Sequence, residues 1–357
     1  MDGAYLAAAV RCAGDQLGRR RAAGQLVVLR RGRVVLDRVF GAGVDRRSLF
    51  LIYSCSKPYV ALLTHLLVER GLLSLDEPIA AHWPRFGRHG KGGITARHVL
   101  THRAGVPDDW AFWGLMTAPS WQASVWRMEE LRPIWPPGEV TAYHALTYGW
   151  ILGELVRRVS GTPVEGLLRE ALLEPLGLED TYLGLPRAET ARAVPIVPAG
   201  GRAELANAAV FNRRRYRRAV APAATVSSTA RDVARFFEML RRGGELAGAR
   251  VLAPETVAEA RRPAGPASEP DRALGRPTRW AQGFHLGGPR SRRDLGRFMG
   301  TLSRPAAFGA IGSDCCTAWV DPERELVFAY VTSLLLPSPA GIVHHGLVAD
   351  CVLRACG

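Results

Sequence analysis

The chain has 357 residues, enough for one large or two ordinary domains, and its 47% hydrophobic content can fill a buried core. A formal net charge of +14 is typical of nucleic-acid binders, but no nucleic-acid-binding motif accompanies it, so no nucleic-acid partner is expected. No apolar stretch reaches the ~18 residues of a membrane span, and the N-terminus lacks the basic start of a signal peptide, which predicts a cytoplasmic protein without a membrane partner.

The predicted elements change character along the chain. Helical spacing of apolar residues predicts a first helix over 7–23, and β-rich runs at 25–29 and 34–40 predict a hairpin. From 54 to about 262 the pattern is mostly helical, with helices predicted over 96–102, 146–160, 163–173 and 230–242. A loop rich in Pro, Gly and Ala follows at 263–277. Strand-like runs at 306–311, 316–320 and 326–333 and a closing helix over 341–355 complete the chain.

Strands therefore occupy both ends of the sequence and helices its middle. This order predicts an α+β fold with one antiparallel sheet built from both termini, flanked by helices, and an inserted helical lobe. The sheet lobe would comprise 1–53 plus 281–357, and the helical lobe 54–280. We expect an active site in the cleft between the two lobes.

The most informative motif is Ser54-Cys55-Ser56-Lys57, which reads S-x-x-K. Pro58 is tolerated only in the first turn of a helix, so the helix should begin at about Ser54 or Cys55, with Ser54 and Lys57 on one face. Unlike arginine, lysine can accept a proton from a hydroxyl, and lysines are only two of the 47 basic residues. The motif predicts a nucleophile, an adjacent base and one backbone oxyanion donor, although an ordinary helix cap beside a surface lysine is the alternative.

Aromatic residues downstream supply further candidates. Tyr143 lies on a loop before the predicted helix over 146–160, where a tyrosine can act as a proton shuttle. His144 could tune this tyrosine or contact the substrate. Trp110 and Trp113 could line an acyl pocket, with core packing as an equal alternative.

The sequence gives less support to a metal site or to a cysteine nucleophile. His98 and His102 stand at i and i+4 on a predicted helix, but spacing places no third ligand, so we expect no metal. The six cysteines show no zinc spacing, and Cys55 should point about 100° away from Ser54. No cofactor is expected.

Taken together, these motifs resemble the serine β-lactamase-like superfamily, in the branch that holds class C β-lactamases, D,D-carboxypeptidases and related esterases and transacylases. The resemblance spans nearly the whole sequence and favours the enzymatic interpretation of Ser54. It is carried by residues 27–40, 54–57, 72–76, 94–107, 137–139, 143–150, 228–236 and 308–312.

The resemblance implies specific roles. Ser54 would attack a carbonyl and form an acyl-enzyme, Lys57 and Tyr143 would manage its proton, and the backbone N–H groups of Ser54 and Ser313 would hold the oxyanion. The substrate-binding edge strand carries K-T-G in β-lactamases and commonly H-x-G in esterases, but reads Ala310-Ile311-Gly312 in this chain. The cation that would meet a β-lactam carboxylate is therefore missing, and we expect open space beside Ala310.

The leading hypothesis is a serine hydrolase or acyltransferase, esterase-like, that acts on an ester, thioester or amide through a Ser54 acyl-enzyme and is a poor β-lactamase. One alternative is carrier-protein-linked acyl transfer or peptide cyclisation in a biosynthetic pathway, because a basic surface suits an acidic carrier protein. The other is a catalytically weak binding protein that retains the fold, motivated by Ala310.

Overall fold

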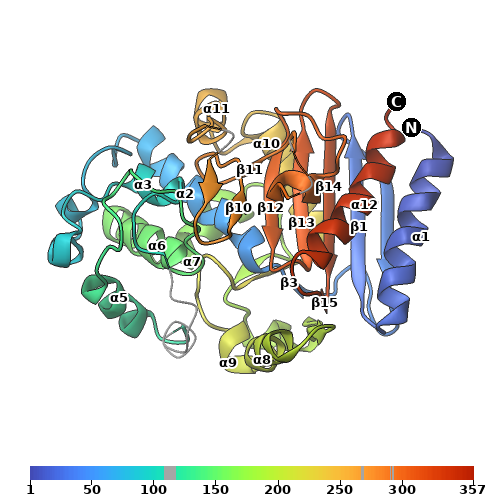
Figure 1. Cartoon of the computed structure of the whole chain (residues 1–357), viewed down its shortest axis with the longest axis horizontal. Helices are drawn as coiled ribbons and strands as arrows, with labels where there is room; N and C mark the ends of the chain where they lie inside the picture. Colours follow the sequence, from blue (N-terminus) through green and yellow to red (C-terminus); the bar gives the residue numbers. More distant parts are fainter. Residues whose placement is uncertain (108–117, 267–268, 290, 292) are drawn as a thin grey trace.

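The computed structural model describes residues 1–107, 118–266, 269–289, 291 and 293–357 (Figure 1). Its α-helices are α1 (Gly3–Arg19), α2 (Lys57–Glu69), α3 (Ala96–Leu100), α5 (Trp121–Glu130), α6 (Thr147–Ser160), α7 (Val164–Leu168), α8 (Arg202–Phe211), α9 (Arg214–Arg217), α10 (Ala230–Arg241), α11 (Pro254–Ala260) and α12 (Ala340–Arg354). Tighter or wider helical turns are η1 (Tyr53–Ser56), η2 (Ile79–Ala81), η3 (Pro84–Gly90), η4 (Arg169–Leu173), η5 (Arg187–Arg192) and η6 (Leu295–Met299).

The main sheet has six strands in the order β11-β12-β13-β14-β1-β2, all antiparallel. These strands are β1 (Gly24–Arg30), β2 (Arg33–Phe40), β11 (His285–Leu286), β12 (Phe308–Gly312), β13 (Cys316–Asp321) and β14 (Leu326–Thr332). β1 pairs with β14 from Gly24 opposite Thr332 to Arg30 opposite Leu326, so the two ends of the chain meet in the centre of the sheet. The α+β fold with a sheet from both termini is confirmed.

The remaining strands are short and lie outside this sheet. They are β3 (Phe50–Leu51), β4 (Tyr182–Leu183), β5 (Val197–Pro198), β6 (Val226–Ser228), β7 (Glu245–Leu246), β8 (Ala249–Arg250), β9 (Pro270–Asp271), β10 (Arg276–Pro277) and β15 (Leu334–Leu335). β9 and β10 form a two-stranded hairpin inside the segment predicted as a loop.

Side-chain alternation along β14 divides the core into two layers. Leu326, Phe328 and Tyr330 face one hydrophobic cluster, which α1 and α12 cover, as Figure 1 shows. Val327, Ala329 and Val331 face the other cluster, towards α10 and the helical part of the molecule. Because successive strand residues point to opposite faces, a strand that is buried throughout must be apolar on both sides.

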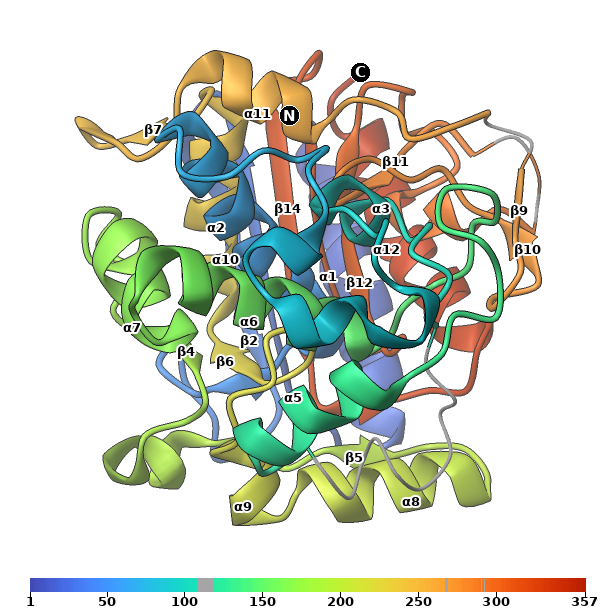
Figure 2. The same ribbon diagram turned by 90° about the vertical axis from the view of Figure 1, so that its left-hand side faces the viewer.

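Helices that lie in sequence between the N-terminal and the C-terminal strands pack together beside the main sheet. α2, α3, α5, α6 and α7 form this group, seen face-on in Figure 2. α10 departs from the simple division, because it packs on β1, β13 and β14. The proposed lobe boundaries at 53/54 and 280/281 stay a prediction.

Several helix ends differ from the sequence-based expectation. The first helix covers Gly3–Arg19, four residues earlier than predicted, because Ala22 and Ala23 lead into β1. α3 stops at Leu100, and His102 adopts a left-handed φ of 59°, so His98 and His102 do not share a helix. No helix in the described ranges is long and apolar enough to cross a membrane.

Candidate active site

Ser54 lies in the turn η1, directly before α2. The prediction that the α-helix begins at Ser54 or Cys55 is wrong by two or three residues, since a 3-10 turn precedes the first α-helical residue, Lys57. Tyr53 holds a left-handed φ of 47°, and its hydroxyl donates to Asn207 Oδ1 at 2.8 Å. Strained backbone of this kind commonly marks functional sites and must be held by its surroundings.

Three side chains meet at the Ser54 hydroxyl. Lys57 Nζ lies 3.1 Å from Ser54 Oγ, and the Tyr143 hydroxyl lies 2.6 Å from the same oxygen. Lys57 is buried, and its Nζ also contacts the carbonyl oxygens of Ala145 at 2.7 Å and Ala223 at 3.5 Å. A neutral amine can donate its two hydrogens to these carbonyls and turn its lone pair to Ser54. The geometry thus suits proton abstraction from the serine.

The nearby histidines are unsuited to serve as the base at neutral pH. Burial lowers the pKa of His144 to about 4 and that of His285 to about 3, and burial also depresses the pKa of His102 well below its usual value. His144 is fully buried, and its Nε2 accepts a hydrogen bond from the Val106 N–H at 3.3 Å. His144 therefore anchors a loop and does not line the substrate pocket, contrary to the expectation of substrate contact.

The structure places Cys55 and His98, the candidates for thiol and metal chemistry, in packing and capping positions. Cys55 is buried, its Sγ donates to the Ala310 carbonyl at 3.4 Å, and burial raises its thiol pKa well above the usual value. His98 Nδ1 accepts from the Thr95 N–H at 3.2 Å and so caps α3. Within the described ranges, no group of three His, Cys, Asp or Glu side chains could hold a metal ion.

The end of β12 approaches the serine turn closely. A Cβ on Gly312 would lie 2.1 Å from the Ile52 carbonyl oxygen, so only glycine permits this approach. Ser313 follows with a left-handed φ of 44°. Ser54 and Ser313 both line one pocket, and the Ser54 N–H belongs to the first helical turn, whose N–H groups lack intrahelical acceptors. These two N–H groups are the candidate oxyanion donors.

The pocket above Ser54 has a volume of about 310 Å³. Its wall is mainly apolar, made by Leu274, Leu295, Ile311, Leu335, Leu336 and Ile342. Polar and charged side chains stand at other points of the lining, namely Tyr143, Glu204, Asn207, Arg276, His285, Asp314 and Ser338. Such a mixture, apolar with a few polar groups, is typical of small-molecule sites.

The edge-strand expectation is only partly met. Ile311 lines the pocket, whereas Ala310 and Gly312 do not. Ala310 is 2% exposed and faces the core, opposite Ala318 on β13. The expected open space beside Ala310 is therefore not part of the pocket. Trp110 and Trp113 lie outside the described residues.

Sequence reasoning missed several residues at this site. Asp271 lies in the segment 263–277 that was predicted as a loop, and Trp280 and His285 follow it, where no element was predicted. Ala203, Glu204 and Asn207 come from α8, whose weak apolar pattern did not predict a helix. No motif marks these positions, because their role depends on long-range packing.

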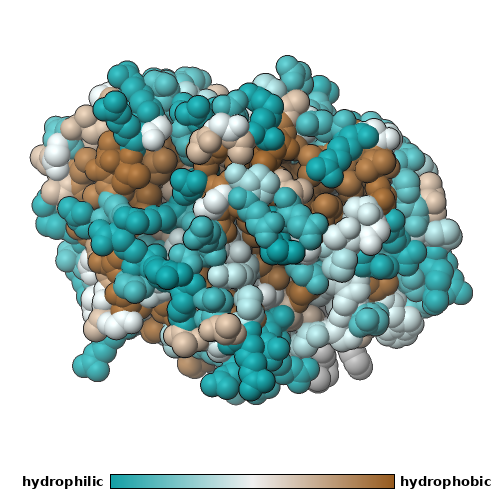
Figure 3. All heavy atoms as spheres, turned by 180° about the vertical axis from the view of Figure 1, so that it is seen from behind, coloured by the Kyte–Doolittle hydropathy of each residue, from teal (hydrophilic) through white to brown (hydrophobic). Residues whose placement is uncertain are grey.

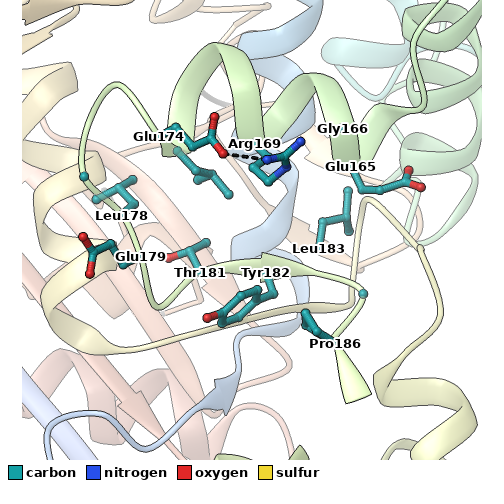
Figure 4. Close-up of a pocket in the computed structure, with 13 residues that line it drawn as sticks. Glu165, Gly166, Arg169, Glu174, Leu178, Glu179, Thr181, Tyr182, Leu183 and Pro186 are labelled. Carbon is teal, nitrogen blue, oxygen red and sulfur yellow. Dashed lines mark hydrogen bonds and ion pairs between the residues drawn. The ribbon is translucent and has the colours of Figure 1, made fainter. Parts of the chain in front are cut away.

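A larger pocket of about 530 Å³ lies elsewhere, between η4, β4 and the turn at Pro186, and shares no residue with the Ser54 pocket (Figure 4). Its lining combines leucines with Glu165, Glu174 and Glu179, and Arg169 pairs with Glu174. Its described lining includes no serine, cysteine, lysine or histidine. Pocket volume therefore does not identify the candidate active site. The meeting of reactive side chains at Ser54 does.

Comparison with known proteins agrees with this geometry. A family model described as Beta-lactamase matches residues 6–351. The esterase/beta-lactamase LipL of Mycobacterium tuberculosis is 32% identical, over 93% of this chain and 81% of its own length.

Solved structures share the fold over nearly the entire chain. The crystal structure of a penicillin-binding protein homologue from Caulobacter crescentus superimposes with a TM-score of 0.81 at 26% identity, covering 98% of this chain and 97% of the other. A family VIII carboxylesterase superimposes with a TM-score of 0.83 at 25% identity, covering 99% and 97%. The fold is thus of the β-lactamase and transpeptidase type.

Proposed function

The chain belongs to the β-lactamase family, and from its site we propose that it is a serine carboxylesterase that cleaves uncharged esters through a Ser54 acyl-enzyme. The observation that carries this proposal is the double contact of Ser54 Oγ with Lys57 Nζ and the Tyr143 hydroxyl at the floor of an apolar pocket. A nucleophile with an adjacent base and proton donor is what ester cleavage requires. The names of LipL and of the carboxylesterase relative support the same reaction class.

In the acylation step, the Lys57 amine takes the hydroxyl proton while Ser54 Oγ forms a bond to the ester carbonyl carbon. The carbonyl oxygen becomes an oxyanion, which the N–H groups of Ser54 and Ser313 stabilise. The carbon–oxygen bond to the alcohol then breaks. Tyr143 delivers a proton to the departing alkoxide and recovers one from Lys57, to which its ring lies close, with Nζ 4.7 Å from the ring centroid.

Deacylation runs through the same groups in reverse. A water molecule loses its proton to the Lys57 amine, its oxygen attacks the acyl carbon, and the bond to Ser54 Oγ breaks. The serine regains a proton, and the acid leaves. An alcohol or amine in place of water would turn hydrolysis into acyl transfer without any change in the protein groups.

The charges around the pocket disfavour a strongly anionic substrate. Arg276 is a cation in the described lining, and its Nη2 donates to Ser338 Oγ at 3.3 Å. Asp314 lies near it, and burial raises the Asp314 pKa to about 6, while Ser338 and Arg276 oppose that rise. At neutral pH the carboxylate therefore offsets the charge of Arg276, so the described lining offers a β-lactam carboxylate little net positive charge.

The proposal is tested with a fluorophosphonate probe and a series of p-nitrophenyl esters from acetate to decanoate. Wild-type protein should be labelled once and should hydrolyse short to medium acyl chains, while Ser54→Ala should lose both properties. Ser56→Ala is the matched control, because Ser56 lies in the same turn but its Oγ accepts from the Val226 N–H at 3.1 Å. Labelling that persists in Ser54→Ala, or nitrocefin turnover equal to ester turnover, would contradict the proposal.

A second candidate function is acyl transfer from an acidic carrier protein. The observation that favours it is a row of exposed arginines after α8, the helix that lines the pocket: Arg213, Arg214, Arg215 and Arg218. In the described part of the chain none of the four takes part in an ion pair. Figure 3 shows hydrophilic side chains interspersed with apolar ones over the face seen from behind Figure 1, so exposed polar surface is common. What singles out this row is its place directly after the pocket-lining helix α8. Unpaired cations beside a site steer acidic partners towards it.

The carrier hypothesis makes a separate prediction. An acyl group on an acidic carrier protein should react about tenfold faster than the same acyl group on N-acetylcysteamine at low salt, and the advantage should fall as salt rises. Replacing Arg213, Arg214 and Arg215 with glutamate should remove it. The exposed triplet at 19–21 beside the end of α1 provides the control. Equal rates for both thioesters would leave hydrolysis of free esters as the better account.

A further inference from the structure

Asp271 is a fully buried carboxylate held next to the active-site tyrosine. It ends β9, and its exposed fraction is 0%. Its Oδ1 accepts from the Tyr143 N–H at 3.0 Å, although 128 positions separate the two residues. The same oxygen accepts from the N–H groups of Ala273 at 3.0 Å and Leu274 at 2.9 Å. Asp271 thus ties its own hairpin to the loop that carries Tyr143.

The second oxygen of Asp271 binds an indole. Trp280 Nε1 donates to Asp271 Oδ2 at 3.0 Å. All four groups bound to the carboxylate are N–H donors, and an ionised carboxylate, which accepts hydrogen bonds at both oxygens, matches them. Burial raises the pKa of Asp271, whereas the contacts with Leu274, Tyr143, Trp280 and Ala273 oppose that rise.

The indole also packs on the phenol. The rings of Trp280 and Tyr143 are stacked, with centroids 5.6 Å apart and an interplanar angle of 7°. His102 and His285 also pack on the indole, each with its ring centroid 4.2 Å from Trp280, and His102 contacts the phenol too, with its centroid 4.9 Å from that of Tyr143. The indole therefore cannot shift easily, and its stack with Tyr143 restricts movement of the phenol.

Tyr143 needs such external support because its own segment provides little. Residues 140–144 form no helix, strand or turn, and α6 begins only at Thr147. A tyrosine on irregular backbone can move its hydroxyl by more than the tolerance of a proton-transfer contact, and a misplacement of about 1 Å can cost ~100-fold in rate.

We propose that Asp271 and Trp280 act as a clamp that fixes the Tyr143 hydroxyl against Ser54 Oγ for proton transfer. Asp271 fixes the backbone of Tyr143 and the indole together, and the indole fixes the plane of the phenol. Both are positioning residues, since neither contacts Ser54. This inference rests on the proposed hydrolase function.

Two variants separate the parts of the clamp. Trp280→Phe keeps an aromatic ring for the stack but removes the N–H that reaches Asp271 Oδ2, and Asp271→Asn removes the charge and one acceptor. Both should lower kcat for a p-nitrophenyl ester, by about tenfold for Trp280→Phe and about 100-fold for Asp271→Asn, with KM changed less than threefold. Trp121→Phe is the matched control, because Trp121 Nε1 donates to buried Glu154 Oε2 at 2.9 Å in a different part of the molecule.

A double-mutant cycle with Tyr143→Phe distinguishes positioning from general destabilisation. If the clamp acts through the phenolic hydroxyl, Asp271→Asn should reduce kcat by less than threefold in the Tyr143→Phe background. If Asp271 merely holds the fold together, the loss should be about 100-fold in both backgrounds, and the inference is overturned. Thermal unfolding of all variants shows whether enough folded protein remains for the comparison.

Failure of the inference and failure of the proposed function give different results. Wild-type protein that neither reacts with the fluorophosphonate probe nor hydrolyses any ester would remove the function on which the clamp depends. An active, Ser54-dependent wild type with a fully additive cycle, or with unchanged kcat in Asp271→Asn, would overturn the clamp alone. A loss in kcat that is confined to backgrounds with an intact Tyr143 supports it.

Discussion

The two lysines of this chain, Lys57 and Lys91, are both buried against carbonyl oxygens, yet they stand in different chemical settings. Lys57 Nζ meets the Ser54 hydroxyl at 3.1 Å in addition to two carbonyls. Lys91 Nζ donates to three carbonyls, those of Arg88 and Glu129 at 2.9 Å and that of Leu131.

The difference suits the same side chain to proton transfer in one place and to a structural role in another. Three carbonyl acceptors use all three hydrogens of an ammonium group, so Lys91 is held in its charged form and ties η3 to the end of α5. Burial lowers the Lys91 pKa to about 8, which still leaves it protonated at neutral pH. At Lys57 a hydroxyl replaces one carbonyl, and a hydroxyl can give a proton as well as accept a hydrogen bond.

The strongest test of this comparison removes each amine in turn. Lys57→Met should lower the acylation rate by about 10⁴-fold, at the upper end for general acid–base groups, because among the described residues no other group near Ser54 can take its proton at neutral pH. Lys91→Met should leave kcat per folded molecule within about twofold. Single-turnover kinetics with a p-nitrophenyl ester measures both rates.

Lys57→Arg adds a control for charge. The guanidinium keeps the positive charge but cannot accept a proton, so this variant should be as inactive as Lys57→Met. Activity within tenfold of wild type in Lys57→Arg would contradict the role of Lys57 as a base. In that case Lys57 would resemble Lys91, because both would supply only a positive charge.

Tyr143→Phe should have the next largest effect. Loss of the phenolic hydroxyl removes the donor to the leaving alkoxide, and we expect kcat to fall by about 100-fold or more with little change in KM. Leaving groups of low pKa need less protonation, so the loss should be smaller for p-nitrophenyl esters than for the matching ethyl esters. An equal loss for both leaving groups would argue against this role.

Much of the fold and the grouping of Ser54, Lys57 and Tyr143 at the candidate site could be predicted from the sequence. The hairpin β1–β2 and the strands β12, β13 and β14 follow directly from local β-rich patterns, and S-x-x-K with Tyr143 identified Ser54 and the two groups that contact its hydroxyl. Local pattern and motif spacing carry this information.

The pocket itself could not be predicted in the same way. Asp271 reaches the site on a hairpin of two-residue strands, too short for any periodicity, and Trp280 follows that hairpin in irregular backbone. The helix α8 has almost no apolar face. Ala310 was misjudged because an alanine on a strand reveals neither which face it occupies nor what packs on it. Only the pairing of Ala310 with Ala318 places it in the core.

In contrast to Lys57→Met, which should lower activity, Lys91→Met should lower the stability of the fold. It would leave three carbonyl oxygens around η3 and α5 without their donor, which should lower the free energy of unfolding by about 2–3 kcal/mol. Urea unfolding followed by tryptophan fluorescence measures the change. Unaltered stability would mean that water replaces the amine, and that Lys91 is not the structural counterpart of Lys57.

The smallest expected effect concerns pH and the residues beside Lys57. His144 is fully buried in the loop next to Tyr143, and burial lowers its pKa to about 4 from an ordinary value near 6.5. The unfolded chain binds a proton at His144 below about pH 6.5, while the folded chain does not until about pH 4. Stability should therefore fall as the pH drops through this window, by about 2 kcal/mol between pH 7 and pH 5 for this residue.

His144→Gln, whose side-chain oxygen can still accept from the Val106 N–H, should be less stable than wild type at pH 7 but should lose about 2 kcal/mol less on going to pH 5. Urea unfolding at both pH values measures this difference in stability. An identical pH dependence in the two proteins would show that His144 titrates normally. The surroundings of Lys57 would then be more hydrated than their burial indicates.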